Sequence, residues 1–434
     1  MADNTTGPTA VRDEDLGPEL EPEIPEDSLE DPAPEPKPVL ASRPAEQRVT
    51  WAELFFDLVW VFAITELAHA LAYSSGPTGI LRTLVLTIPL WWGWNSVTLL
   101  GNASGERLDS PRGRLLLFLM GAIGLGMAVA VPDAYGGNGL LFAVCFILLR
   151  LLLWMEMHRL HFYGELRMEP FALGLVIAGP LFLAGALAPD PWRLGLWGAG
   201  ALLEVAGPAL LGHRLDHIKL EAAHLPERFG LIIIMALGET VVTLGTQAAS
   251  GPLGPSRVAA LGVGFLLVIG LWWTYFHFGA PAVRHGLETS AVQARILRDV
   301  FHYAHFCYLL AVICIAVSLR ELIRAPMENG HELAACLVAP GAGLYFLGFC
   351  YSRWRMYGSA ALSRFAAALA CFAVMPLTPL LPAVAVAGLV AALVIALNVV
   401  EYWVITTGRP VIFLHTPKCW VRWRQRSRDL NKSE

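Results

Sequence analysis

The first long apolar run of the chain carries two pairs of ionisable residues at helical spacing. Glu53 and Asp57 are four residues apart, and Glu66 and His69 are three apart. Residues at these spacings share one helix face, and a rise of about 1.5 Å per residue puts roughly 20 Å between the pairs. A charged side chain at bilayer depth costs about 2.5–3.5 kcal/mol on insertion scales. Each pair is therefore a candidate to move a proton, to hold a cation or to form an internal ion pair.

A later apolar run repeats this theme. Glu227 and Arg228 stand at its start, where an acidic residue is ordinary, but Glu239 lies in the middle of IIIMALGETVV. A carboxylate at that depth would take up a proton or find a cation. The expected cationic partners are Arg150, His302 and His305. Of all the acidic residues, Asp57 and Glu239 are the strongest functional candidates, and we expect both to reach a central cavity.

Histidines and acids also raise the question of a metal site. His302 and His305 share a helical face and could bind a metal together with a carboxylate. The chain has no HExxH motif, however, and Glu66-x-x-His69 has no second ExxH to complete a di-iron site. The sequence therefore predicts no evident cofactor. Hydrogen-bonded structural histidines are the alternative.

Clustered tryptophans form a further group of candidates. They stand inside apolar runs beside Asn95 and Tyr275, at Trp91, Trp92, Trp94, Trp272 and Trp273. Tryptophan commonly marks the membrane–water interface. Aromatic faces also stabilise cations, so these residues are alternatively candidates to line a cavity.

Composition identifies the elements that must position these residues. The 434-residue chain is 56% hydrophobic and 15% charged, whereas soluble domains have about 45–50% and about 25%. Of its 36 acidic residues, 13 fall within residues 1–50, which leaves too few charges to cover a water-soluble body. The fold class is therefore an all-α polytopic membrane bundle. No basic stripe with interleaved aromatics favours nucleic acid as a partner.

Twelve apolar segments are long enough to be membrane-helix candidates, since a spanning helix needs about 20 such residues. Continuous runs of this length exclude the alternating pattern of a membrane barrel. The predicted helices cover residues 51–72, 79–100, 113–131, 138–157, 171–188, 192–211, 229–249, 256–279, 300–319, 332–352, 360–376 and 380–406.

Basic residues predict the orientation of these helices. Loops after even-numbered helices hold 13 Lys and Arg residues, and loops after odd-numbered helices hold five. Basic loops stay in the cytoplasm, so both termini are predicted to be cytoplasmic. Residues 1–45, rich in Pro and acidic side chains, are predicted to be a disordered tail. Residues 408–434 are predicted to be a basic cytoplasmic tail.

A weak internal repeat divides the membrane body. Glu53 and Glu66 recur as Glu227 and Glu239, and the tryptophan clusters recur in the same order. The pattern predicts two parallel six-helix halves, residues 46–211 and 229–407, joined by a cytoplasmic loop at 212–228. Glu204 and Glu401 hold related late positions in the two halves and are expected to make packing contacts.

Four sequence blocks resemble the low temperature requirement A (LtrA) family. They are WAELFFDLVWVFAI (51–64), HLPERFGLIIIMALGETVV (224–242), GLWWTYF (270–276) and HYAHF (302–306), within a resemblance that spans residues 46–407. The resemblance implies a multi-pass protein of the bacterial inner membrane, named for a growth requirement in the cold. It implies no particular mechanism.

Three classes of function fit these residues. The first is a proton- or ion-coupled transporter of a small solute, which would use the buried acids and histidines as a relay. The second is an intramembrane enzyme acting on a lipid or a prenyl diphosphate, in which carboxylates would hold Mg²⁺ and aromatic side chains would shield a cation. The third is a membrane sensor or scaffold. The transporter is favoured, with the lipid bilayer and a small molecule or ion as partners.

Overall fold

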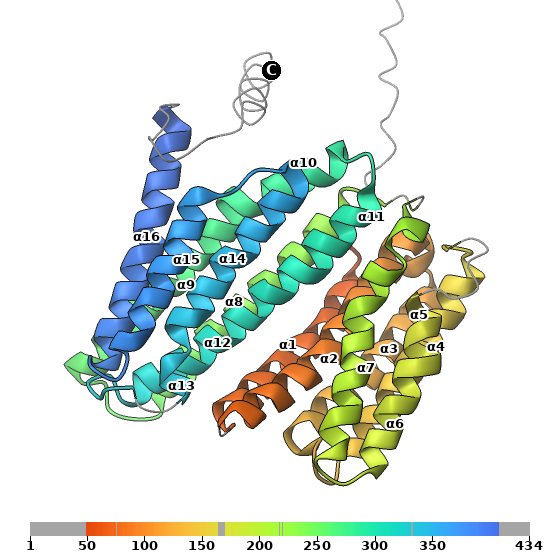
Figure 1. Cartoon of the computed structure of the whole chain (residues 1–434), viewed down its shortest axis with the longest axis horizontal. Helices are drawn as coiled ribbons and strands as arrows, with labels where there is room; N and C mark the ends of the chain where they lie inside the picture. Colours follow the sequence, from red (N-terminus) through yellow and green to blue (C-terminus); the bar gives the residue numbers. More distant parts are fainter. Residues whose placement is uncertain are drawn as a thin grey trace, which may run out of the picture. The chain divides into compact units, whose positions relative to one another are not determined.

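The computed structural model describes residues 49–74, 76–163, 170–216, 218, 220–330 and 333–407 (Figure 1). Both predicted tails, residues 1–45 and 408–434, lie outside these ranges. The described residues form helices and no β-strand; one isolated bridge joins Asn329 and Pro382. The predicted all-α class is therefore confirmed.

The described residues of the first half form six main helical stretches. They are α1 (Trp51–Ala72), α2 (Gly76–Ser104), α3 (Pro111–Ala130), α4 (Gly139–Arg159), the continuous run α5–η3–α6 (Pro170–Leu187) and α7 (Trp192–Leu210). Local chemistry sets where helices begin: Thr50 caps α1 through a capping box with Glu53, and Ser110 caps α3 ahead of Pro111. The predicted limits of 51–72 match α1 fully.

In the second half, the residues that the structure places also form six main stretches, some of them longer than predicted. They are α8 (His224–Ala249), α9–η5–α10 (Pro255–Thr289), α11–η6–α12 (Gln293–Arg324), α13 (Leu333–Cys336) with α14 (Val338–Tyr357), α15 (Leu362–Val374) and α16 (Ala383–Thr407). Helix α8 begins at His224, inside the loop predicted at 212–228. Its first two turns carry His224 and Arg228, whose buried partners on α1 hold this end of the helix in the bundle.

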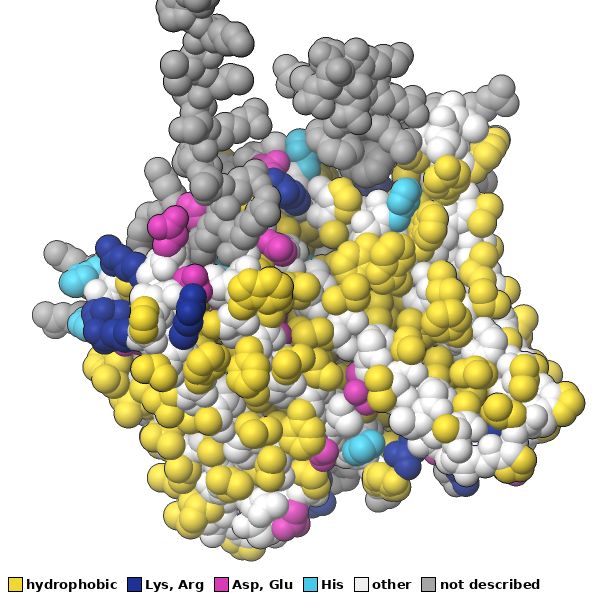
Figure 2. Space-filling model, turned by 180° about the vertical axis from the view of Figure 1, so that it is seen from behind, with side chains coloured by type: hydrophobic (Ala, Val, Ile, Leu, Met, Phe, Trp, Pro, Cys, Tyr) yellow, Lys and Arg dark blue, Asp and Glu magenta, His cyan; other side chains and the backbone are white. Residues whose placement is uncertain are grey.

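Eight helices of the described chain are long and apolar enough to cross a membrane. Of the twelve predicted segments, α2, α7, α14 and α15 fall outside this set. Helix α15 has only 13 residues, and α2 carries a polar series that includes Asn95, Ser96 and Thr98. The apolar surface fits a bilayer: hydrophobic side chains dominate the face drawn in Figure 2, and large ones such as Phe118 and Leu266 are exposed.

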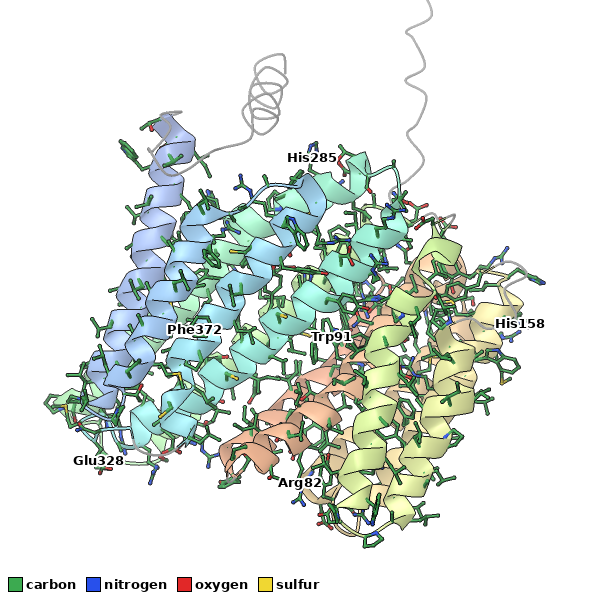
Figure 3. The ribbon with its side chains drawn as sticks, viewed as in Figure 1. Arg82, Trp91, His158, His285, Glu328 and Phe372 are labelled. Carbon is green, nitrogen blue, oxygen red and sulfur yellow. The ribbon has the colours of Figure 1, made fainter. Side chains whose placement is uncertain are left out.

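The helices of the two halves pack in the same order. Helix α1 packs on α3 as α8 packs on α12, α3 on α4 as α12 on α14, and α6 on α7 as α15 on α16. Helices α1 and α2 also contact α8, which joins the halves. One end of the bundle carries His158 and His285, and the other carries Arg82 and Glu328 (Figure 3). We refer to them as the His285 end and the Arg82 end.

Candidate functional site

Asp57 lies in a buried ion pair between the two halves. Its Oδ2 accepts a hydrogen bond of 2.7 Å from Nη1 of Arg228 on α8, and its Oδ1 accepts one of 2.9 Å from Nε1 of Trp94 on α2. Arg228 also donates to Thr98 and lies 5.7 Å from the Trp94 ring centroid. Asp57 and Arg228 are both fully buried. Three helices therefore share one charged cluster.

Glu53 extends this cluster toward the His285 end. Its Oε1 lies 3.0 Å from Nε2 of His224 and 3.9 Å from Nε of Arg228. Only 1% of the Glu53 residue is exposed. Gly101 on α2 makes the close approach possible, because a Cβ at that position would overlap Glu53 Oε1. Glu227, one residue before Arg228, is exposed and lies outside this buried cluster.

A second buried pair, Arg150 with Glu204, lies within the first half. Arg150 on α4 contacts Oε2 of Glu204 on α7 and donates to Ser96 on α2 over 2.9 Å. Both charged side chains are at most 4% exposed. The backbone of η3 (Gly174–Ala178) passes close by: a Cβ on Gly174 would lie 2.5 Å from Glu204 Oε1. This π-helical segment thus fits a glycine against the ion pair, and such segments are frequent at functional sites.

The Arg150–Glu204 pair lines a cavity of about 60 Å³ among α2, α4, α7 and η6 (Leu297–Ala304). Four buried polar atoms on its lining residues have no hydrogen-bond partner within the described chain. They are Trp92 Nε1, Asn95 Oδ1, Glu204 Oε1 and His302 Nδ1, and we call them the open polar atoms. These four residues are all at most 9% exposed. Buried polar groups are almost always paired with protein, water or a ligand, so this cavity is the candidate binding site.

Glu66, His69 and Glu239 lie toward the Arg82 end instead. Glu66 and His69 line an open hollow of about 700 Å³ that also includes Arg82. His69 and Glu239 line a second one of about 240 Å³ with Arg320. Glu239 is half-buried and accepts a 3.5 Å hydrogen bond from Thr243. The structure thus brings together three candidates from two helices, at the opposite end from Glu53.

Asp57 and Glu239 were expected to share a central cavity, but the structure places them far apart. Glu239 lies 11 residues beyond Arg228 on α8, or about 16 Å at the helical rise, and Asp57 is closed in by Arg228. The partners expected for Glu239 are also placed elsewhere, because Arg150 contacts Glu204 and His302 lines the cavity around that pair. Sequence similarity between helices could not show which side chains their packing brings into contact.

The other aromatic and histidine candidates separate into two groups. His305 has both ring nitrogens occupied, by Tyr275 Oη and by the carbonyl of Val300, each at 2.8 Å. Trp91 donates to the carbonyl of His302 and stacks on Trp94 in the core. The sequence left two alternatives for Trp272 and Trp273, the membrane interface or a cavity lining, and the two residues are 40% and 38% exposed. Exposure of this kind is typical of interfacial tryptophans.

Sequence reasoning underrated two residues of these clusters. His224 lies in the loop predicted at 212–228 and was not a site candidate, and Glu204 was expected only to make packing contacts. The spacing of four between His224 and Arg228 was the available signal, since it puts both on the face that meets α1. Among the residues that the structure describes, no three His, Cys, Asp or Glu side chains are grouped so as to hold a metal ion.

Fold and site together define a helical integral membrane protein with a buried polar cavity. The sequence model for the bacterial low temperature requirement A protein (LtrA) matches residues 48–399, and the chain belongs to this family. It is 29% identical over 321 residues to the uncharacterized protein RA0937 of Rhizobium meliloti (strain 1021). The aligned residues cover 70% of this chain and 76% of the relative. No solved structure matches the chain. The resemblance identified from the sequence blocks is thereby confirmed.

Proposed function

We propose that this LtrA-family protein transports a small polar solute across the bacterial inner membrane, coupled to protons or another ion. The solute site is the cavity among α2, α4, α7 and η6. The observation that carries the proposal is that four residues with open polar atoms line one cavity. A ligand would give these groups the hydrogen bonds that the described chain does not supply.

The depth of the cavity supports a transport site. Asn95 and Arg150 each stand nine residues from the helix end at the His285 side, which is about 14 Å along the axis. The hollows around Glu66, His69 and Glu239 approach from the Arg82 end. The Asp57–Arg228 cluster lies on the His285 side of these hollows, six residues from the start of α1 and four from the start of α8. It joins the halves through titratable groups and is thus the candidate coupling element.

Repeated contacts support a transporter built from two halves with about twelve spanning helices. The helices of each half pack in the same order. Glu204 on α7 holds the buried Arg150, and its counterpart Glu401 on α16 holds Arg364 through two hydrogen bonds of 2.8 and 2.9 Å. Such repeats commonly move against each other around a site near the membrane midplane.

Topology provides the first prediction. Residue 135 follows α3 near the Arg82 end, and residue 220 precedes α8 at the His285 end. With cytoplasmic termini, alkaline phosphatase fused after residue 135 should be active and a fusion after residue 220 inactive. Green fluorescent protein fusions should report the reverse. Agreement between the two positions would contradict the proposed topology.

The proposed transport function is tested by substituting one side chain, that of Trp92. Trp92→Phe removes an open polar atom and keeps an aromatic ring, so the protein should fold while solute uptake falls at least tenfold. The measurement is uptake of radiolabelled glycerol, ethanolamine and glycerate into proteoliposomes containing the full chain. These probes represent neutral, cationic and anionic solutes.

The matched control is Trp60→Phe. The Nε1 of Trp60 also has no hydrogen-bond partner in the described chain, but this residue lines a small apolar void. Trp60→Phe loses the same volume, and it should keep wild-type uptake. Equal uptake by both variants would remove the cavity from the mechanism. No uptake of any probe, together with Mg²⁺-dependent consumption of a prenyl diphosphate, would instead establish the enzyme alternative.

A further inference from the structure

The lining of the proposed solute cavity carries more positive than negative charge. Among the described residues that line it, three are arginines, Arg150, Arg295 and Arg298, and one is an acid, Glu204. Arginine stays protonated in proteins. Glu204 is paired with Arg150, so these two charges balance each other. The positive charge that remains on the lining belongs to Arg295 and Arg298, which reach the cavity from the run α11–η6–α12.

One buried carboxylate, that of Asp299, is shared by two arginines. Its oxygens accept hydrogen bonds of 2.7 and 3.2 Å from Nε and Nη2 of Arg298, and one of 2.6 Å from Nε of Arg355. The Asp299 side chain is 5% exposed, whereas those of Arg298 and Arg355 are 21% and 32% exposed. A single negative charge therefore stands against two positive charges, and this cluster holds a positive charge in excess.

Arg298 also has a nitrogen with which to bind a ligand. Its Nε and Nη2 donate to Asp299, but its Nη1 has no hydrogen-bond partner in the described chain. Nη1 lies beside Gly212 of the cavity lining, where an added Cβ would come within 2.6 Å of it. Guanidinium groups donate strong hydrogen bonds to carboxylate and phosphate oxygens. Arg298 can therefore hold Asp299 and donate to an anionic group in the cavity.

The basic part of the cavity lining reaches the surface at the His285 end, where α11 (Gln293–Ile296) lies (Figure 1). The side chain of Arg295 on α11 is 58% exposed and donates to Asp216 over 2.9 Å. Positive charge at the opening of a cleft raises the local concentration of anions. Resting on the proposed transport function, we infer that the solute is a small soluble anion, whose carboxylate or phosphate group accepts a hydrogen bond from Arg298.

The test measures retention of radiolabelled probes by the purified full-length protein, using equilibrium dialysis in detergent. Glycerate represents carboxylates and inorganic phosphate represents phosphates, while glycerol and ethanolamine are the neutral and cationic comparisons. Glycerate and glycerol share a carbon skeleton, so a difference between them reports the effect of the charged group. At least one anion should be retained about tenfold more than glycerol and ethanolamine. Retention of glycerol or ethanolamine that equals or exceeds that of both anions would overturn the assignment.

Arg298→Gln removes the excess charge and should lower retention of the anion about tenfold. The variant should fold, because Asp299 keeps its hydrogen bond from Arg355, and a monodisperse peak in size-exclusion chromatography checks this. The matched control is Arg112→Gln, which removes the same charge outside the cavity. Arg112 stands at the start of α3 with 70% of its side chain exposed, 3.5 Å from Glu156. This control should keep wild-type retention.

Gly212→Ala is the second variant, in case Arg298→Gln does not fold. It leaves every charge in place and fills the space beside Nη1 of Arg298, so retention of the anion should fall about threefold. Gly198→Ala, whose Cβ would meet no atom of the described chain within 4 Å, is its control. Wild-type retention in a folded Arg298→Gln protein, or in Gly212→Ala where the glutamine variant does not fold, would overturn the role of Arg298.

Two further results separate the source of the anion from the transport function. If phosphatidylglycerol added to the detergent displaced the anion at a lower concentration than the unlabelled anion itself, the site would belong to a lipid headgroup and the soluble anion would be rejected. An anion that binds through Arg298 but is never taken up by proteoliposomes rejects transport and supports the ligand class. Uptake of glycerol or ethanolamine that depends on Trp92, without uptake of either anion, supports transport and overturns the anion.

Discussion

Arg228→Met should lower the free energy of unfolding by about 3–5 kcal/mol, because it leaves the buried Asp57 carboxylate without its ion-pair partner. The same change withdraws the guanidinium that lies 3.9 Å from Glu53 Oε1 and the hydrogen bond to Thr98. The measurement is denaturant unfolding of the purified protein in mild detergent. Thermal loss of the monodisperse peak in size-exclusion chromatography provides an independent readout.

Two companion variants make this result specific. Arg295→Met breaks an ion pair of 2.9 Å with Asp216 in which the arginine side chain is 58% exposed, and an exposed pair contributes only about 0–1 kcal/mol. The double variant Asp57→Leu with Arg228→Met should recover part of the loss, since it removes both buried charges and leaves Glu53 its contact with His224. If Arg228→Met were as stable as Arg295→Met, the cluster would not hold the two halves together.

Gly174→Ala should lower stability by about 1–3 kcal/mol, the usual cost of overpacking a buried site, and should abolish solute uptake. The new Cβ would lie 2.5 Å from Glu204 Oε1 and 3.3 Å from Arg150 Nε, so the ion pair has to move. Because Glu204 is one of the residues that line the cavity, moving its carboxylate also changes the shape of the cavity. Unfolding in detergent and uptake into proteoliposomes check the two effects.

Gly198→Ala is the control for this variant. It lies on α7, one turn and a half before Glu204, and its Cβ would meet no atom of the described chain within 4 Å. Alanine is the better helix former by about 1 kcal/mol, so this variant should be at least as stable as wild type and keep its uptake. Wild-type stability and uptake in Gly174→Ala would show that the Arg150–Glu204 pair does not require the close backbone.

The sequence was sufficient for those features that depend on each segment by itself. Apolar length placed the helices, because hydropathy is a local property. The limits of α1 agree fully, and the signature blocks around Asp57 and Arg228 identified the family. Even the presence of buried polar residues was readable, since an ionisable side chain inside an apolar run must be satisfied somewhere in the bundle.

Only the tertiary structure decided which of these residues meet. Asp57 and Arg228 are 171 residues apart, and no pattern along the chain selects that pair over Asp57 with Glu239. Trp92 and Trp272 stand in similar motifs, yet one lines the cavity and the other is exposed. Helical spacing tells which residues share a face, but the rotation of each helix against its neighbours decides which face is covered. That rotation is set by packing across the whole bundle, including the glycines at 101 and 174 that let ion pairs approach the backbone.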